Sequence, residues 1–142
     1  MCSGGGEALL TAAREGDVQT VTYLLRCEKV DFEVNHEDDE GRTALFYAAQ
    51  NGNVEVVNAL LSDSLLTPNK ADIFGKTPII VASEQGHESV VRALLSDTRV
   101  DPNKADKYGQ TPIGIASYRG HEGIVKALLA HTGEDRSNIL VI

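Results

Sequence analysis

Residues 72–95 read DIFGKTPIIVASEQGHESVVRALL, and this stretch decides the fold of the chain. The same pattern returns over residues 106–129 and 38–61, at a constant spacing of 34 residues. A weaker copy, which lacks the opening turn, runs over residues 9–25. Self-similarity at a fixed period of this size indicates a solenoid in which each unit stacks on its neighbours.

The quoted unit has a physical interpretation as a turn, two short helices and a return loop. Gly75 suits a turn that needs positive φ. Thr77 and Pro78 suit a helix start, because threonine caps unpaired amides and proline has no N–H to leave unpaired. Gly86 suits the end of this first helix, and residues 87–95 carry the apolar stripe of a second helix. Such a unit is too small to bury its own faces, so the sequence predicts an all-α fold of four stacked helix-turn-helix units.

The two best-preserved units share an Asp/Gly turn, a Thr-Pro pair, a small residue in the first helix, a Gly-His pair and a closing apolar stripe. This combination resembles the ankyrin repeat family, and the resemblance covers residues 7–131. It implies an all-α solenoid with projecting β-turn loops, whose turn tips and first helices bind another protein. The residues that carry it are Asp72, Gly75, Thr77, Pro78, Ala82, Gly86, His87, Val90, Val91, Leu94 and Leu95, and Asp106, Gly109, Thr111, Pro112, Ala116, Gly120, His121, Ile124, Val125, Leu128 and Leu129.

One position departs from the family's pattern. Members usually carry a histidine two residues after the proline, hydrogen-bonded to the threonine, whereas this chain has Phe46, Ile80 and Gly114 in that position. We therefore expect this Thr–His network to be absent. We also expect Gly114 to weaken its helix by about 0.5–1 kcal/mol relative to alanine.

The period divides the chain into four repeats with a short segment on either side. The last repeat is unusual, because its apolar stripe matches that of an inner repeat, whereas a terminal repeat normally presents a polar outer face. The predicted divisions are a flexible lead over 1–6, repeats at 7–37, 38–71, 72–105 and 106–131, and a tail over 132–142.

The tail carries the apolar residues 139–142 after a polar stretch. We expect these four residues to fold back over the last helix pair as a cap. Two alternatives stay open: the sequence is cut from a longer array, or its Leu-Val-Ile end adds as a strand to a PDZ-type partner.

The chain is acidic, with a formal net charge of −8. Residues 1–42 hold ten acidic and four basic side chains, and thus most of the charge. We expect no nucleic-acid partner, because phosphate backbones bind clustered Lys and Arg. The acidic loop at 37–40 is either a solvated loop or a surface that speeds the approach of a protein with a basic face.

Several features of the sequence bear on the cellular location of the protein. It has no run of about 18 apolar residues and no secretory signal at its start. Cys2 and Cys27 do not make a disulfide framework. These features predict a cytoplasmic monomer, with the nucleus as the alternative location, and no membrane insertion or secretion.

No arrangement of residues predicts catalysis. The GKT sequence at 75–77 resembles the end of a phosphate-binding loop, but Lys70 stands where that loop needs a glycine. His87 and His121 occupy a slot that holds Asn or Asp in the other units, which indicates a turn and helix-cap position rather than a metal ligand. We therefore predict no enzyme activity, no cofactor and no metal site.

Positions whose residue differs between units, while the residues beside them keep their type, are expected to form the binding surface. They lie at the turn tips and at the ends of the first helices. Phe74 and Tyr108 are expected on adjacent tips about 10 Å apart, unless both rings pack onto the neighbouring turn. The predicted protein-binding residues are Gln50, Asn51, Ile73, Phe74, Lys76, Glu84, Gln85, Lys107, Tyr108, Gln110, Tyr118 and Arg119.

Within this set, Phe74, Tyr108, Tyr118 and Arg119 are expected to carry most of the affinity, because aromatic and arginine side chains dominate interface hot spots. The predicted function is protein–protein interaction as an adaptor or scaffold. Two other roles stay open: a stoichiometric inhibitor or regulatory subunit of an enzyme such as a kinase, and a structural subunit of a larger assembly.

Overall fold

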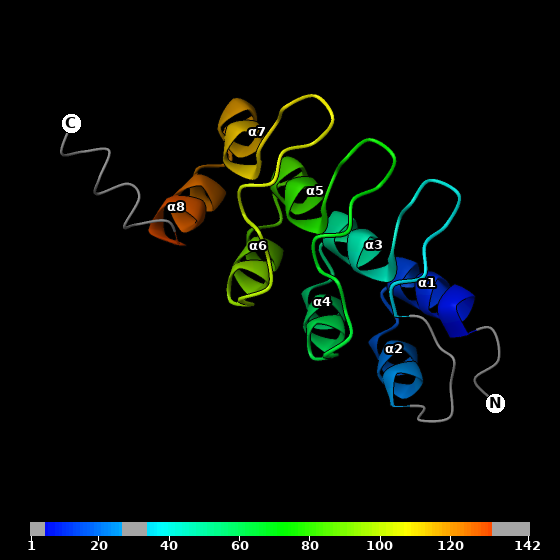
Figure 1. Cartoon of the computed structure of the whole chain (residues 1–142). Coiled ribbons are helices and arrows are strands. Elements are labelled where there is room, and N and C mark those ends of the chain that lie inside the picture. Colours follow the sequence, from blue (N-terminus) through cyan, green and yellow to red (C-terminus); the bar gives the residue numbers. More distant parts are fainter. Residues whose placement is uncertain (1–4, 27–33, 132–142) are drawn as a thin grey trace, which may run out of the picture.

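The computed structural model describes residues 5–26 and 34–131, and all its helices are α-helices. They form four consecutive pairs that stack side by side into an elongated array (Figure 1). This confirms the predicted all-α solenoid of helix-turn-helix units. The helices of the described part are α1 (Gly5–Glu15), α2 (Val18–Leu25), α3 (Ala44–Asn51), α4 (Val54–Leu61), α5 (Pro78–Gln85), α6 (Glu88–Leu95), α7 (Pro112–Arg119) and α8 (Glu122–His131).

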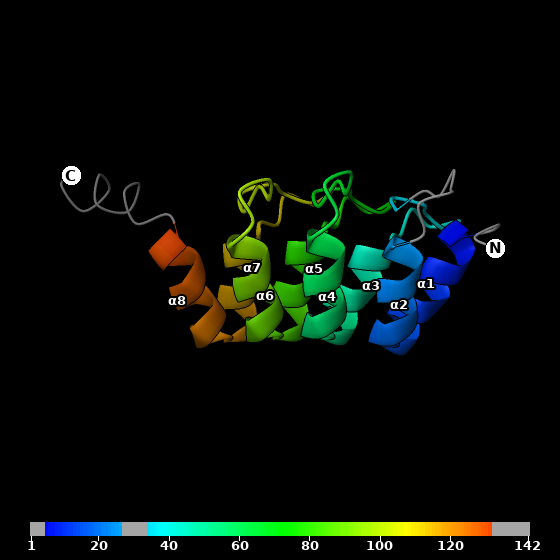
Figure 2. The ribbon, with the colours of Figure 1, turned by 90° about the horizontal axis from the view of Figure 1, so that it is seen from below.

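The pairs build two layers (Figure 1). The first helices α1, α3, α5 and α7 lie in one row, and the second helices α2, α4, α6 and α8 lie in the other. Long loops project at one end of the helices (Figure 2) and extend past the row of first helices. The turn tips therefore lie on the same side of the molecule as the first helices. None of the helices described combines the length and apolar character that crossing a membrane requires.

The first helices start and end as the sequence predicts. Thr77 has extended backbone torsions, its hydroxyl accepts the amide three residues on, and Pro78 follows it in the first turn. Thr43 and Thr111 cap α3 and α7 in the same way. Gly86 ends α5 with a φ of 81°, a left-handed conformation that residues with a Cβ rarely adopt. The glycines that end α3 and α7 have the same conformation.

The slot before the second helix is the N-cap position, as predicted, but not every residue in it caps the helix with its side chain. Asp17 does cap α2, since its carboxylate accepts a backbone amide of the first turn. His87 precedes α6 without a side-chain cap, and its Nε2 lies 3.0 Å from the Gln50 carbonyl oxygen. His121 lies 3.3 Å from the Glu84 carbonyl oxygen. Imidazole is long enough to reach the preceding unit, so these histidines join repeats.

Helix α1 begins at Gly5, within the lead predicted over residues 1–6. The loop between α2 and α3 packs on this start, because a Cβ on Gly6 would come within 2.6 Å of the His36 ring. His36 Nε2 also lies 2.9 Å from the Glu7 carboxylate. The predictions for residues 1–4 and for the tail over 132–142 concern segments outside the described residues.

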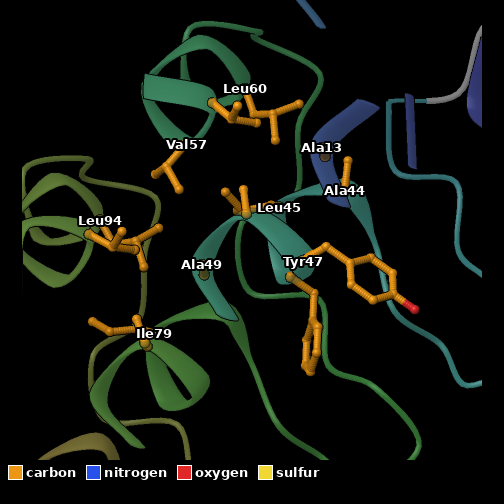
Figure 3. Close-up of a cluster of buried hydrophobic side chains, with 14 of the residues drawn as sticks. Ala13, Ala44, Leu45, Tyr47, Ala49, Val57, Leu60, Ile79 and Leu94 are labelled. Carbon is orange, nitrogen blue, oxygen red and sulfur yellow. The ribbon is translucent and has the colours of Figure 1, made fainter. Parts of the chain in front are cut away.

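The core lies between the two layers and is mainly aliphatic, with Phe46 and Tyr47 as its aromatic members (Figure 3). Leu45 of α3 lies among Val57 and Leu60 of α4 and Ile79 and Leu94 of the next unit, and all five are fully buried. Burying one such side chain contributes about 1.5–3 kcal/mol. Because the cluster spans two units, the stability of each repeat depends on its neighbour.

Candidate protein-binding surface

Backbone hydrogen bonds join neighbouring turn tips. The Ile73 amide donates to the Glu40 carbonyl, and the Lys107 amide donates to the Phe74 carbonyl, each at 3.0 Å. Within each turn an aspartate, such as Asp72, accepts two amides further along the loop. The predicted adjacency of the tips is confirmed, and hydrogen bonds join the tip at Ile73 and Phe74 to the tips on both of its sides.

This row of tips exposes large apolar side chains. Tyr108 is 67% exposed, Ile73 is 55% exposed and Phe74 is 37% exposed. The rest of the protein therefore covers much of Phe74 and little of Tyr108. A ring that stands in solvent on a fixed backbone offers a partner a large area to bury at a small loss of conformational entropy.

The predicted site residues lie in two rows, one at the turn tips and one at the ends of the first helices. The second row lies at the far ends of the first helices, and an eight-residue helix such as α5 is about 12 Å long. In this row Tyr118 of α7 is 87% exposed. The turn-tip row consists of Ile73, Phe74, Lys76, Lys107, Tyr108 and Gln110, and the helix-end row consists of Gln50, Asn51, Glu84, Gln85, Tyr118 and Arg119.

Three charged residues connect the two rows. Lys76 Nζ lies 3.1 Å from one carboxylate oxygen of Glu84, and an Arg119 guanidinium nitrogen lies 3.2 Å from the other. The Glu84 side chain is only 14% exposed, so two cations from successive units share a mostly buried carboxylate. The trio fixes the direction of the Arg119 side chain and leaves one net positive charge on this part of the surface.

Two site residues of the helix-end row mainly join repeats. The Asn51 side-chain amide donates to a carbonyl oxygen of α1 at 3.0 Å. The Gln50 carbonyl is bonded to the histidine of the next unit. Asn51 is exposed as well, whereas Gln50 is only partly exposed. The side chains of Gln85, Lys107 and Gln110 are exposed and make no hydrogen bond with another described residue, so they are freer to contact a partner than Asn51.

In the acidic loop at 37–40, Asp38 is held by local contacts. It accepts two backbone amides of its own turn and the Tyr47 hydroxyl. Burial favours the neutral acid, but the hydrogen bonds outweigh it and lower the pKa of Asp38. Asp38 thus stabilises the turn and is not free to meet a partner.

Two neighbouring acids of this loop are paired as well. Glu37 lies 2.8 Å from Lys70, and Glu40 lies 3.1 Å from Arg42. Asp39 is exposed and makes no hydrogen bond or ion pair within the described residues. The loop therefore offers a basic partner fewer free carboxylates than its sequence suggests.

Two exposed apolar side chains lie outside the predicted surface. Tyr23 of α2 is 62% exposed, and Leu65 of a return loop is exposed too. Helix α2 belongs to the layer of second helices, away from the turn tips (Figure 1). The positions equivalent to Tyr23 in the other units are Ala59, Ala93 and Ala127. The sequence alone therefore marks Tyr23 as an unusual aromatic residue on a second helix.

A family model described as "Ankyrin repeats (3 copies)" matches residues 2–70 and 63–138. The two matches overlap and together span nearly the whole chain. They agree with the four stacked helix pairs and the bonded row of turn tips described above.

Proposed function

Because this chain belongs to the ankyrin repeat family, whose repeats are generally protein–protein interaction modules, we propose that it binds a partner protein through the turn-tip and helix-end rows. The observation that carries the proposal is the exposure of Tyr108 and Tyr118, one in each row of the fourth unit. Both rings have two side-chain torsions and sit on backbone that is already ordered. A partner would therefore bury them at a low entropic cost.

The charged side chains of the surface support the same role. Arg119 is held beside Tyr118 through Glu84, and Lys107 is exposed beside Tyr108. Arginine next to aromatic rings is typical of the residues that dominate binding energy at interfaces. We propose that the partner presents an apolar strip flanked by acidic groups to the fourth unit, and that Asp39 meets a basic group at the other end.

Binding of this kind needs no catalytic group. We propose a non-catalytic adaptor or scaffold that acts as a monomer in the cytoplasm or nucleus. An inhibitor or regulatory subunit would use the same surface. A difference in the partner's own activity with and without the chain would distinguish an inhibitor from a scaffold.

The experiment captures partners from a cell lysate on the immobilised full chain and identifies them by mass spectrometry. The double variant Tyr108→Ala/Tyr118→Ala tests the surface. Tyr23→Ala is the matched control, because it removes a tyrosine of similar exposure to Tyr108 from the other layer. We expect a partner that the wild type and Tyr23→Ala retain and the double variant loses. Equal capture by all three proteins would contradict the proposal.

A further inference from the structure

The fourth unit presents a docking face that no described residue covers. In the inner units, a histidine of the next unit lies over the glycine that ends the first helix. A Cβ on Gly52 would come within 2.7 Å of the His87 ring, and one on Gly86 within 2.8 Å of the His121 ring. A Cβ on Gly120 would meet no described atom within 4 Å.

Within the described residues, the hydrogen bonds that join successive loops also end at the fourth unit. The Phe74 carbonyl accepts the Lys107 amide, whereas the Tyr108 carbonyl accepts no amide of the described part. The Asn69 side chain donates to one backbone group of the next loop and accepts from another, both at 2.8 Å. The Asn103 side chain makes no such bond among the residues described. The Tyr108 carbonyl and the Asn103 side chain, which occupy the positions that dock a further loop, thus bond to no partner of this kind among the described residues.

A groove of about 310 Å³ lies on this face between α7 and α8. In the preceding unit, Ser83 occupies the equivalent position and is fully buried, whereas Ser117 is exposed. The groove is therefore the place where a further helix pair would pack. It is lined by Ala116, Ser117, Gly120, Glu122, Val125 and Lys126.

The residues that follow α8 are within reach of this groove. Seven residues, 132–138, separate His131 from the apolar residues 139–142. A chain of eight extended residues spans up to about 26 Å. Val125 lies six helical residues before His131, or about 9 Å along α8. The linker is therefore long enough to return the apolar residues along α8 to the groove.

The sequence after α8 does not continue the repeat. The period places Leu140 where Asp72 and Asp106 hold their turns, and a leucine cannot accept the turn amides. It also places Glu134 where Leu66 is buried, and an unpaired carboxylate there would be costly. The four apolar residues are therefore not needed for a fifth turn and are available to cover another surface.

We propose that residues 139–142 lie in the groove between α7 and α8 and cap the array in place of a further helix pair. Their side chains cover Val125 and the small residues at the end of α7. The cap removes apolar surface from water and blocks the face from stacking on a second copy of the chain.

The test compares residues 1–142 with a chain that lacks 139–142, and places Val125→Gln in both. Hydrogen exchange read by mass spectrometry should show more deuterium uptake in α7 and α8 of the shortened chain, and equal uptake in α3 and α4. Its melting temperature should fall by about 3–6 °C. Val125→Gln should lower the melting temperature of the full chain more than that of the shortened chain, because the contact is already absent from the latter.

Asp135→Asn, in the polar linker, is the control that should leave uptake and melting unchanged. Equal uptake and equal melting of the full and shortened chains would overturn the proposal. Additive effects of Val125→Gln and the deletion would overturn it as well. So would a full chain that is a dimer by light scattering while the shortened chain is a monomer, because a second copy would then cover the groove.

Discussion

The third and fourth units share the residues of the repeat pattern and differ in what surrounds them. Ile79 and Ile113 occupy one slot, yet Ile79 is fully buried and Ile113 is only half-buried. Ser83 is fully buried, while Ser117, its equivalent, is exposed. The pattern of a unit fixes its helices and caps, but the next unit decides which of its side chains become core. Identical residues at equivalent positions are therefore buried in the third unit and more exposed to solvent in the fourth.

The largest difference between the two units is expected for their isoleucines. Ile79→Ala should lower the free energy of unfolding by about 2–5 kcal/mol, because it opens a cavity in a cluster that spans two units. Ile113→Ala should cost about half as much or less, since solvent already contacts that side chain. Urea unfolding of both variants checks this, and equal losses would break the comparison.

Glycine substitutions at the ends of α5 and α7 test the same comparison between the third and fourth units. Both glycines have positive φ, so valine is strained at either position. Gly86→Val also collides with the His121 ring and should cost about 2–4 kcal/mol, whereas Gly120→Val carries the strain alone, about 1–2 kcal/mol. Thermal or urea unfolding measures the difference. Indistinguishable variants would mean that the histidine contact does not matter to stability.

The smallest effect is expected at the junction between the second and third units. Arg99 donates to carbonyl groups of Leu61, Asp63 and Leu66 and pairs with Asp97 at 2.8 Å. The hydrogen bond from Arg99, which outweighs burial, lowers the pKa of Asp97 below its usual 3.8.

A depressed carboxyl pKa stabilises the fold above the usual value, and the contribution is lost as pH falls through the folded-state value. Asp97→Asn should therefore cost about 1 kcal/mol or less near neutral pH, and the deficit should shrink below pH 3.8. Urea unfolding from pH 7 to pH 3 measures it, with Asp39→Asn as the exposed control. A deficit that stays constant with pH would show that the ion pair does not contribute.

The fold was predictable because its signals are local. The Thr77-Pro78 start and the Gly86 stop lie a few residues from the groups they pair with, so their spacing alone locates α5. The adjacency of the Phe74 and Tyr108 tips follows from the period in the same way. These features depend on the backbone of one unit or on the repeat distance, and both are readable from one sequence.

The contacts between units were not predictable to the same degree. His87 bonds to Gln50, and Arg119 bonds to Glu84, across 37 and 35 residues. Such pairs depend on which rotamer each side chain takes once two units have stacked, and the period does not encode this. For the same reason the sequence did not show that Glu37 of the acidic loop pairs with Lys70.

The central claim is that the exposed tyrosines of the fourth unit bind a protein partner, and a matched affinity measurement tests it most directly. With the captured partner purified, the dissociation constant is measured by calorimetry for the wild type, Tyr108→Ala and Tyr23→Ala, after equal melting temperatures have been established. Tyr108→Ala should weaken binding by at least about 10-fold, and Tyr23→Ala by less than about 2-fold. Equal affinities for the two variants, or a larger loss for Tyr23→Ala, would contradict the account.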